Sequence, residues 1–161
     1  MRGKAFKFGD NISTDHIAPG RLFHLRSNLP EFAKHVLEDA DPNFARSMQK
    51  GDFVVGGSNF GLGSSREHAP QIIKIAGVGA VIAKSFARIF FRNSINNGLL
   101  LIEQPDLHDD IKEGDEVTVV MNEHVDYNGK QYPIASLPEN LMSIIQAGGL
   151  VKAMRKLNGL D

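Results

Sequence analysis

The sequence predicts an α/β fold in which a mixed sheet is flanked by helices. Short apolar runs rich in Val, Ile and Leu, each bounded by Gly or polar residues, recur at 53–55, 78–83 and 99–102. Such runs are typical of strands that are buried on both faces of a sheet. Helical patterns lie between them, and a second set of β runs follows near the end of the chain. The order of strand, helix and strand therefore predicts a layered α/β domain.

Local periodicity and turn residues predict the other elements of the first half. Residues 4–8 alternate as a strand, which the polar loop 9–13 ends. A helix is expected over 29–37, because Pro30 fits its first turn and Phe32, Val36 and Leu37 form an apolar stripe. A second short helix is expected over 85–93.

The second half changes character. Residues 116–121 form a β run, and residues 125–132 predict a hairpin that turns at Asn128-Gly129, since this pair favours the tight turns of antiparallel strands. A helical segment over 138–157 is expected to break at Gly148-Gly149.

Composition restricts the class of protein. The 161 residues, 42% of them hydrophobic, suffice for one domain spanning 1–161, and the net charge of −1 gives no reason to expect nucleic acid or a membrane surface as partner. No apolar run approaches the about 18 residues of a membrane span, so a cytoplasmic protein is expected.

The chain has no Cys, and His24, His35, His108 and His124 show no metal-ligand spacing. No metal site is therefore predicted, and any iron–sulfur cluster must belong to another chain.

The loop at 57–69 is the strongest candidate site. It joins a predicted strand at 52–56 to a predicted helix at 71–77, and at such a junction free N–H groups and the helix dipole favour an anion. Its glycines allow tight turns, Ser64 or Ser65 can cap the helix, and Arg66 can hold a carboxylate through two hydrogen bonds. The alternative is a plain helix cap beside a surface arginine. Neither a Walker loop nor a dinucleotide fingerprint is present.

Longer motifs around this loop carry a family resemblance. The segment Gly-Ser-Ser-Arg-Glu-His-Ala at 63–69, the segments at 80–93 and 97–100, and Gly-Asp-Asn-Ile-Ser-Thr-Asp-His-Ile-Ala-Pro-Gly at 9–20 closely resemble the swivelling C-terminal domain of the aconitase superfamily. This resemblance implies a swivelling β/β/α domain. A free-standing chain of this length is similar to the small subunits of two-subunit members, of the 3-isopropylmalate dehydratase and homoaconitase type.

The resemblance also implies partners and an activity. Such a chain would bind no cofactor itself and would work with a large subunit that carries a 4Fe-4S cluster, in a heterodimer or a heterotetramer. Together they would isomerise a 2-hydroxy di- or tricarboxylic acid by dehydration and rehydration, with 3-isopropylmalate in leucine biosynthesis as the first expectation. A tricarboxylate substrate of the aconitase or homoaconitase type is the alternative. An isolated chain is expected to be able to self-associate through the surface meant for its partner.

By the same resemblance, Ser64 is the catalytic base, Ser65 and Arg66 bind a substrate carboxylate, and Asp15, His16 and His68 support the site. A serine hydroxyl is too weak an acid for this role unless N–H donors, a helix N-terminus and a guanidinium stabilise its alkoxide, and the loop can supply all three. For His16 the alternative is a solvated side chain in a polar turn. Lys84, Arg88 and Arg92 fit a solvated basic face and a contact with the large subunit equally well.

The family resemblance also implies that the segment 20–28 meets the variable arm of the substrate. Arg26 lies where single-chain aconitases carry a substrate-binding arginine, and it therefore predicts a carboxylate at the end of that arm, because an unpaired buried carboxylate is costly. An isopropyl arm would need apolar neighbours instead. A different class of function stays open as well: the same loop could capture an anionic metabolite in a non-catalytic binding module.

Overall fold

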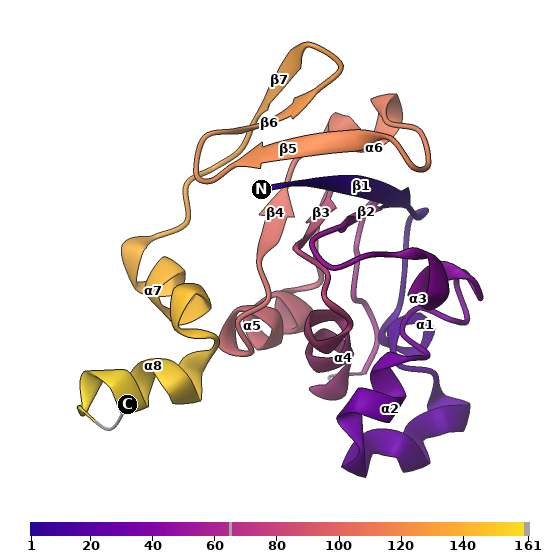
Figure 1. Ribbon diagram of the computed structural model, residues 1–161, viewed down its shortest axis with the longest axis vertical. Coiled ribbons are helices and arrows are strands. Elements are labelled where there is room, and N and C mark those ends of the chain that lie inside the picture. Colours follow the sequence, from indigo (N-terminus) through magenta and orange to yellow (C-terminus); the bar gives the residue numbers. More distant parts are fainter. Residues whose placement is uncertain (65, 160–161) are drawn as a thin grey trace.

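A mixed seven-stranded sheet forms the centre of the computed structural model, which describes residues 1–64 and 66–159. The strand order is β4-β3-β2-β1-β5-β6-β7. Strands β1 to β4 are parallel, whereas β5 to β7 continue from β1 as an antiparallel meander (Figure 1). The bounds are β1 Arg2–Lys7, β2 Phe53–Gly56, β3 Ala80–Ala83, β4 Leu101–Glu103, β5 Glu116–Val120, β6 His124–Tyr127 and β7 Lys130–Pro133. The mixed sheet expected from the sequence is confirmed.

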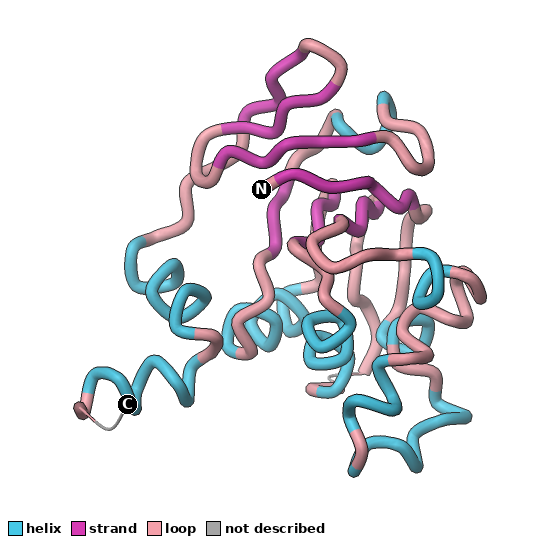
Figure 2. Tube along the Cα trace, viewed as in Figure 1, coloured by secondary structure: helices cyan, strands magenta, loops and turns pink. Residues whose placement is uncertain are grey.

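Short helices connect the strands, and Figure 2 shows most of them gathered at the end of the molecule opposite the antiparallel strands, whereas α6 lies beside β5 (Figure 1). They are α1 Thr14–Ile17, the 3-10 helix η1 Gly20–Ser27, α2 Leu29–Ala33, α3 Phe44–Ser47, α4 His68–Ala76, α5 Arg88–Asn96, α6 Leu107–Asp110, α7 Glu139–Ala147 and α8 Leu150–Leu157. The four-residue helices α1, α3 and α6 were not expected from periodicity, because a single turn is too short to show a repeat. The eight-residue 3-10 helix η1 was not expected either, because its three residues per turn do not follow the α-helical period.

Two predicted helices have different bounds in the structure. The helix expected over 29–37 ends at Ala33, and Leu37 beyond it has a φ of 57°. The helix expected over 85–93 begins only at Arg88, because the residues before it pair with the loop after β2: Phe60 N–H donates to Ser85 O, and Ala87 N–H donates to Phe60 O. Tertiary pairing therefore overrides the local helical pattern at this point.

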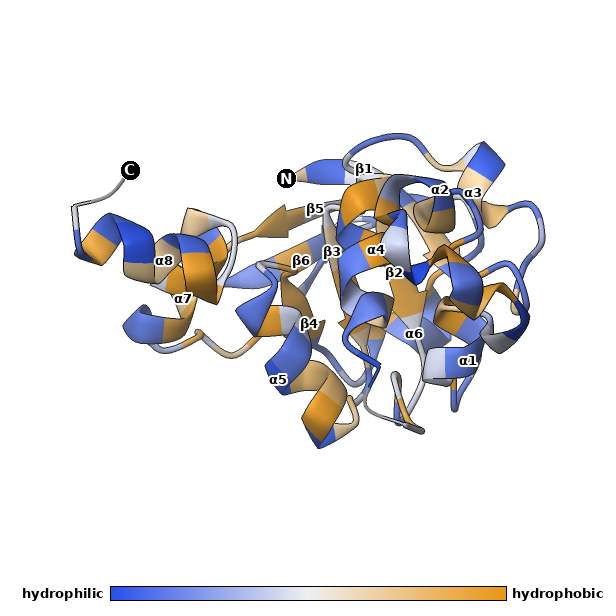
Figure 3. Ribbon diagram, turned by 90° about the horizontal axis from the view of Figure 1, so that it is seen from below, coloured by the Kyte–Doolittle hydropathy of each residue, from blue (hydrophilic) through white to orange (hydrophobic). Residues whose placement is uncertain are grey.

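The sheet separates two apolar cores, and the side-chain alternation of its strands supplies both. Along β2, Val54 points into the core beneath the helices, whereas Phe53 and Val55 point into the core beneath the antiparallel strands. In β3, Val81 points into the core beneath the helices and Ile82 into the core beneath the antiparallel strands. Figure 3, seen from below, shows the hydrophobic central strands with helices over them. Burial on both faces explains why these strands read as continuous apolar runs.

Lys74 links α4 to the junction of the C-terminal helices, which also pack against the body through Met142 and Ile145. Lys74 of α4 donates to the carbonyl oxygens of Asn97 and Gly148 at 3.0 and 2.8 Å. Its burial, followed by the nearby charge of Lys152, lowers the pKa of its ammonium group. Gly148 and Gly149 break the segment into α7 and α8, as expected. Within the described residues, none of the helices is long and apolar enough to cross a membrane.

Candidate active site

Two loops that are distant in sequence are held side by side beyond the ends of β1 and β2. The parallel pairing of the strands continues past them, with Gly57 N–H donating to Gly9 O at 3.0 Å and Gly61 N–H donating to Ile12 O at 2.7 Å. Thr14 N–H then donates to Leu62 O at 2.9 Å, next to a bridge between Ser13 and Leu62. The motif at 9–20 and the glycine-rich loop therefore form one structural unit.

Glycine is required in this unit for close approach as well as for turning. Gly61 has a φ of 87°, and a Cβ there would lie 2.2 Å from Cγ of Phe90. Gly63 has a φ of 106°, and its Cβ would lie 3.2 Å from Thr14 Oγ1. The loop can pack against α5 and α1 only without side chains at these positions.

Ser64 lies at the mouth of a cavity of about 230 Å³ that the loop forms with α1 and α5. The lining residues are Thr14, Gly61, Gly63, Ser64, Arg66, Ala87, Arg88, Ile89, Phe90 and Asn93. Ser64 is exposed, and its carbonyl oxygen accepts hydrogen bonds from Thr14 Oγ1 at 3.0 Å and from Arg66 N–H at 2.8 Å. Its backbone is thus fixed from both sides while its side chain faces solvent.

Ser64 does not cap the following helix, which corrects one sequence expectation. The N-cap residue of α4 is Glu67, which has helical dihedral angles and makes no side-chain cap. Helix α4 therefore begins at His68, four residues after Ser64. Ser65, the other expected cap and carboxylate ligand, lies outside the described residues.

Arg66 is held by the loop that follows the N-terminal motif. Its Nη1 lies 2.5 Å from Asp15 Oδ1 and donates to Ala18 O at 3.2 Å. Gly20 allows this contact, since a Cβ there would lie 3.3 Å from the Asp15 carboxylate and 3.5 Å from Arg66 Nη1. The Arg66 side chain as a whole is largely buried, with 25% of it exposed. The structure thus brings Asp15 and Arg66 together.

Phe23 of η1 joins three of the candidate residues, although the sequence analysis did not single it out. The guanidinium carbon of Arg66 lies 5.3 Å from its ring centroid and that of Arg26 lies 4.8 Å from it, and the ring of His68 packs edge-on at 5.6 Å. Arg26 also donates through Nη1 to Phe23 O at 3.0 Å. The sequence offered one signal for this role, because Phe23 lies between Arg21 and Arg26 and aromatic rings often pack against arginine side chains.

Two other expected residues have different surroundings. His16 accepts a hydrogen bond at Nδ1 from Ser13 N–H at 2.9 Å and so completes a capping box on α1, and it lines another cavity, with Lys7 and Glu113. The buried Nδ1 of His68 has no hydrogen-bond partner among the described residues, so its visible role is packing against Phe23. The supporting role expected of His68 in the site stays a prediction.

The donor set of the chain does not fit an iron–sulfur cluster. The sequence contains no Cys, and residues 1–64 and 66–159 contain no group of three His, Asp or Glu side chains that could hold a metal ion. Clusters of this type are normally held by thiolates.

Comparison with known proteins agrees with the fold and the loop pair. The model of the aconitase C-terminal domain family matches residues 10–107, and the chain belongs to this family. It is 57% identical over 159 residues to the 3-isopropylmalate dehydratase small subunit 1 of Thermotoga maritima, which covers 97% of this chain and 95% of that protein. Identity to the 3-isopropylmalate dehydratase small subunit of Lachnospira eligens is 55%, over 99% of this chain and 96% of that one.

A solved structure extends this similarity to the whole fold. The crystal structure of 3-isopropylmalate dehydratase from Methanocaldococcus jannaschii matches with a TM-score of 0.92 at 41% identity, over 99% of this chain and 95% of that chain. Within its family, the chain therefore groups with the small subunits of 3-isopropylmalate dehydratase.

Proposed function

We propose that this chain is the small subunit of a hydro-lyase that converts 3-isopropylmalate by dehydration and rehydration, in leucine biosynthesis. The observation that carries the proposal is the cavity that unites Ser64 with Arg66, in a chain that resembles these small subunits over nearly its full length. The chain supplies the base and the carboxylate ligands, and a large subunit supplies the rest of the site.

Ser64 takes the proton from the carbon next to a substrate carboxylate while hydroxide leaves the neighbouring carbon, for which the partner's cluster would supply the Lewis acid. On rehydration Ser64 returns the proton to the carbon that lost the hydroxide, and hydroxide adds to the other carbon. Arg66 and Arg88 line the same cavity, and two guanidinium groups favour an alkoxide and an anionic substrate. The hydrogen bonds from Thr14 and Arg66 to the Ser64 carbonyl fix the residue before the substrate arrives. Fixed geometry of this kind is what proton transfer in an enzyme requires.

Arg66 binds a substrate carboxylate with the donors that the protein leaves available. Asp15 and Ala18 both occupy Nη1, and Nε and Nη2 have no hydrogen-bond partner in the described part of the chain. Asp15 therefore fixes the direction of the Arg66 guanidinium. The edge formed by Nε and Nη2 can then donate two parallel hydrogen bonds to a substrate carboxylate.

Arg26 is engaged within its own segment, and this favours an apolar substrate arm. Its guanidinium lies on the Phe23 ring and donates to Phe23 O, so the arginine and the ring present one combined surface. An isopropyl group can pack against such a surface. The carboxylate arm expected from Arg26 alone, and with it a tricarboxylate substrate, becomes the alternative that the assay must test.

The large subunit carries the 4Fe-4S cluster in this proposal, because the donor set of the small chain does not fit one. Neither subunit alone turns over substrate. We propose a cytoplasmic location for the assembled enzyme, whether it is a heterodimer or a heterotetramer.

The test is anaerobic reconstitution with the cognate large subunit, followed by assays on 3-isopropylmalate, citrate and homocitrate. Turnover of 3-isopropylmalate alone is expected, and Ser64→Ala should lower kcat by about 100- to 10,000-fold while the complex still forms. Ser47→Ala, on an exposed serine of α3, is the matched control. Full turnover by Ser64→Ala would rule out the base. A wild-type complex that binds carboxylates but converts none would favour the binding module instead.

A further inference from the structure

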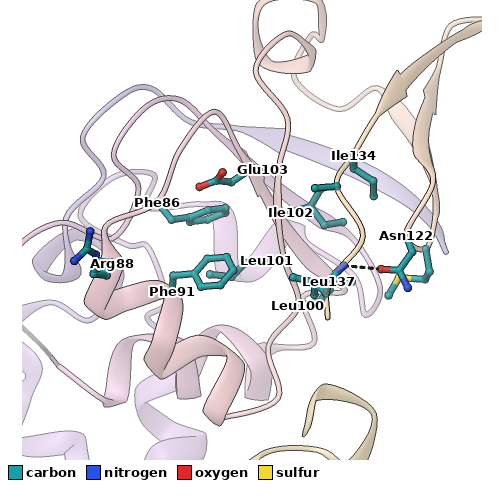
Figure 4. A pocket seen from close by; sticks show the side chains of 12 residues that line it. Phe86, Arg88, Phe91, Leu100, Leu101, Ile102, Glu103, Asn122, Ile134 and Leu137 are labelled. Atoms are coloured by element: carbon teal, nitrogen blue, oxygen red, sulfur yellow. Dashed lines mark hydrogen bonds between the residues drawn. The ribbon is translucent and has the colours of Figure 1, made fainter. Parts of the chain in front are cut away.

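An apolar cavity of about 310 Å³ lies between α5, β4 and the segment that leads to α7. Leu100, Leu101 and Ile102, all at most 6% exposed, form its floor. Phe86 and Phe91 lie toward one side and Ile134 and Leu137 toward the other (Figure 4). We call this cavity the apolar socket, and we propose that it receives an apolar side chain of the large subunit as an anchor of the subunit interface. This inference rests on the proposed function.

The apolar socket adjoins the cavity of Ser64. Arg88 lines both cavities, and its guanidinium points away from the apolar side chains in Figure 4. A partner that completes the active site must cover the mouth of the Ser64 cavity, and a surface that does so reaches Arg88 and the opening beside it. The next residue, Ile89, is 52% exposed and lines the Ser64 cavity. The apolar socket is therefore continuous with the surface that the reaction requires the partner to cover.

The walls of the apolar socket are fixed before any partner binds. Asn122 Oδ1 accepts a hydrogen bond from Leu137 N–H at 3.1 Å, drawn in Figure 4, and Ser136 Oγ donates to Asn122 O at 3.0 Å. A preformed apolar pocket takes up an aliphatic or aromatic side chain at a small entropic cost, and such anchors carry much of the binding energy of an interface.

A second copy of this chain is the less suitable occupant. A copy placed over the apolar socket would also lie against Arg88 and would compete with the large subunit for the Ser64 cavity. A large subunit that brings an apolar side chain to the apolar socket and a carboxylate to Arg88 matches this face, on which Glu103 also lines the apolar socket.

The cysteine-free sequence permits a direct test. Ala135, an exposed residue that lines the apolar socket, is replaced by Cys and labelled with an environment-sensitive fluorophore before the cognate, cluster-loaded large subunit is added anaerobically. The matched control is Val151→Cys on α8, which is 72% exposed and does not line the apolar socket. We expect a blue shift and slower quenching by iodide for the label at 135 and no change at 151.

Affinity provides the second measurement. Ala135→Trp fills the apolar socket and Ala135→Asp places a charge in it, and each should raise the Kd for the large subunit at least about tenfold, as is usual for an interface anchor. Melting temperature and kcat at saturating large subunit should stay at the wild-type values. Val151→Asp should leave the Kd unchanged.

Each outcome decides the inference. Equal Kd values for the wild type and both variants at position 135, or an unchanged label on complex formation, would overturn it. A shift of the label that depends on the concentration of the small chain alone would assign the apolar socket to a second copy. Failure of the proposed function is distinct, because the wild-type complex would then form without converting 3-isopropylmalate.

Discussion

Asp15 Oδ1 lies 2.5 Å from Nη1 of Arg66, and this ion pair joins the N-terminal motif to the glycine-rich loop. Asp15 is the more exposed partner, with 64% of its side chain exposed against 25% for Arg66. The pair therefore contributes little to folding, since exposed ion pairs are weak. Its value lies in fixing the orientation of the guanidinium.

Asp15→Asn is expected to weaken catalysis while the protein stays folded. Loss of a charge-assisted hydrogen bond should lower kcat/KM by about 10- to 100-fold, mainly through KM, because Arg66 then samples other directions. Asp15→Glu should restore part of the loss. Steady-state kinetics of the reconstituted complex measure the effect, with Asp39→Asn, which removes a surface partner of Arg21, as control. An Asp15→Asn enzyme with wild-type KM would contradict the positioning role.

Phe23→Leu should disturb both arginines at once. The ring contacts Arg26 and Arg66 at 4.8 and 5.3 Å, and each exposed cation–π contact contributes about 0.5–1 kcal/mol. The expected result is a KM for 3-isopropylmalate raised about three- to tenfold. Phe23→Tyr keeps the ring and should behave as the wild type. Equal kinetics for the Leu and Tyr variants would show that the ring acts only as a spacer.

Gly61→Ala should destabilise the fold more than a matched glycine substitution. At Gly61 the positive φ and the contact of a Cβ with Phe90 act together, for an expected loss of about 2–5 kcal/mol in the free energy of unfolding. Gly114 also has a positive φ, of 85°, but open space around it, so Gly114→Ala should cost about 1–2 kcal/mol. Urea unfolding of both variants separates crowding from backbone strain, and equal losses would contradict the crowding at Gly61.

Stability is expected to decline at high pH through Tyr132. Burial, together with the hydrogen bond that its hydroxyl donates to Asp110, raises the pKa of Tyr132 to about 12 from a usual value of about 10. Because the folded state holds the proton more tightly, this contribution is complete below pH about 10 and is lost as the pH rises toward about 12. Urea unfolding across this range should show a smaller decline in Tyr132→Phe. Spectrophotometric titration of native Tyr132 at its usual pKa would contradict the assignment.

Much of the fold could be predicted because its signals are local. The runs around Val54, Val81 and Leu101 appear as the buried parallel strands β2, β3 and β4, and Asn128-Gly129 forms the expected hairpin turn, with φ values of 50° and 78°. The start of α5 could not be predicted, because it depends on Ala87 pairing with Phe60 rather than on helix propensity.

In the candidate site, too, residues within local motifs could be predicted, whereas those that depend on tertiary contacts could not. The sequence could single out Ser64, Arg66 and Asp15 as candidates because each lies within a long motif, and their proximity follows from the pairing of the two loops. Phe23 was missed because its contact with Arg66 depends on the 3-10 helix η1, and this helix shows no periodic apolar pattern in the sequence. Whether His16 acts in the site or only caps α1 could not be decided from a polar turn, and its bond to Ser13 describes the second role.

The hydrogen bonds between residues 9–14 and 57–62 make the two loops a single cassette. An insertion in one loop would shift every later pair, so the two loop lengths can change only together. Anyone who transplants this site into another scaffold, or recombines two relatives, must therefore move both segments with their strands β1 and β2. A crossover between them would produce a chain whose halves are each intact but whose loops no longer match in register.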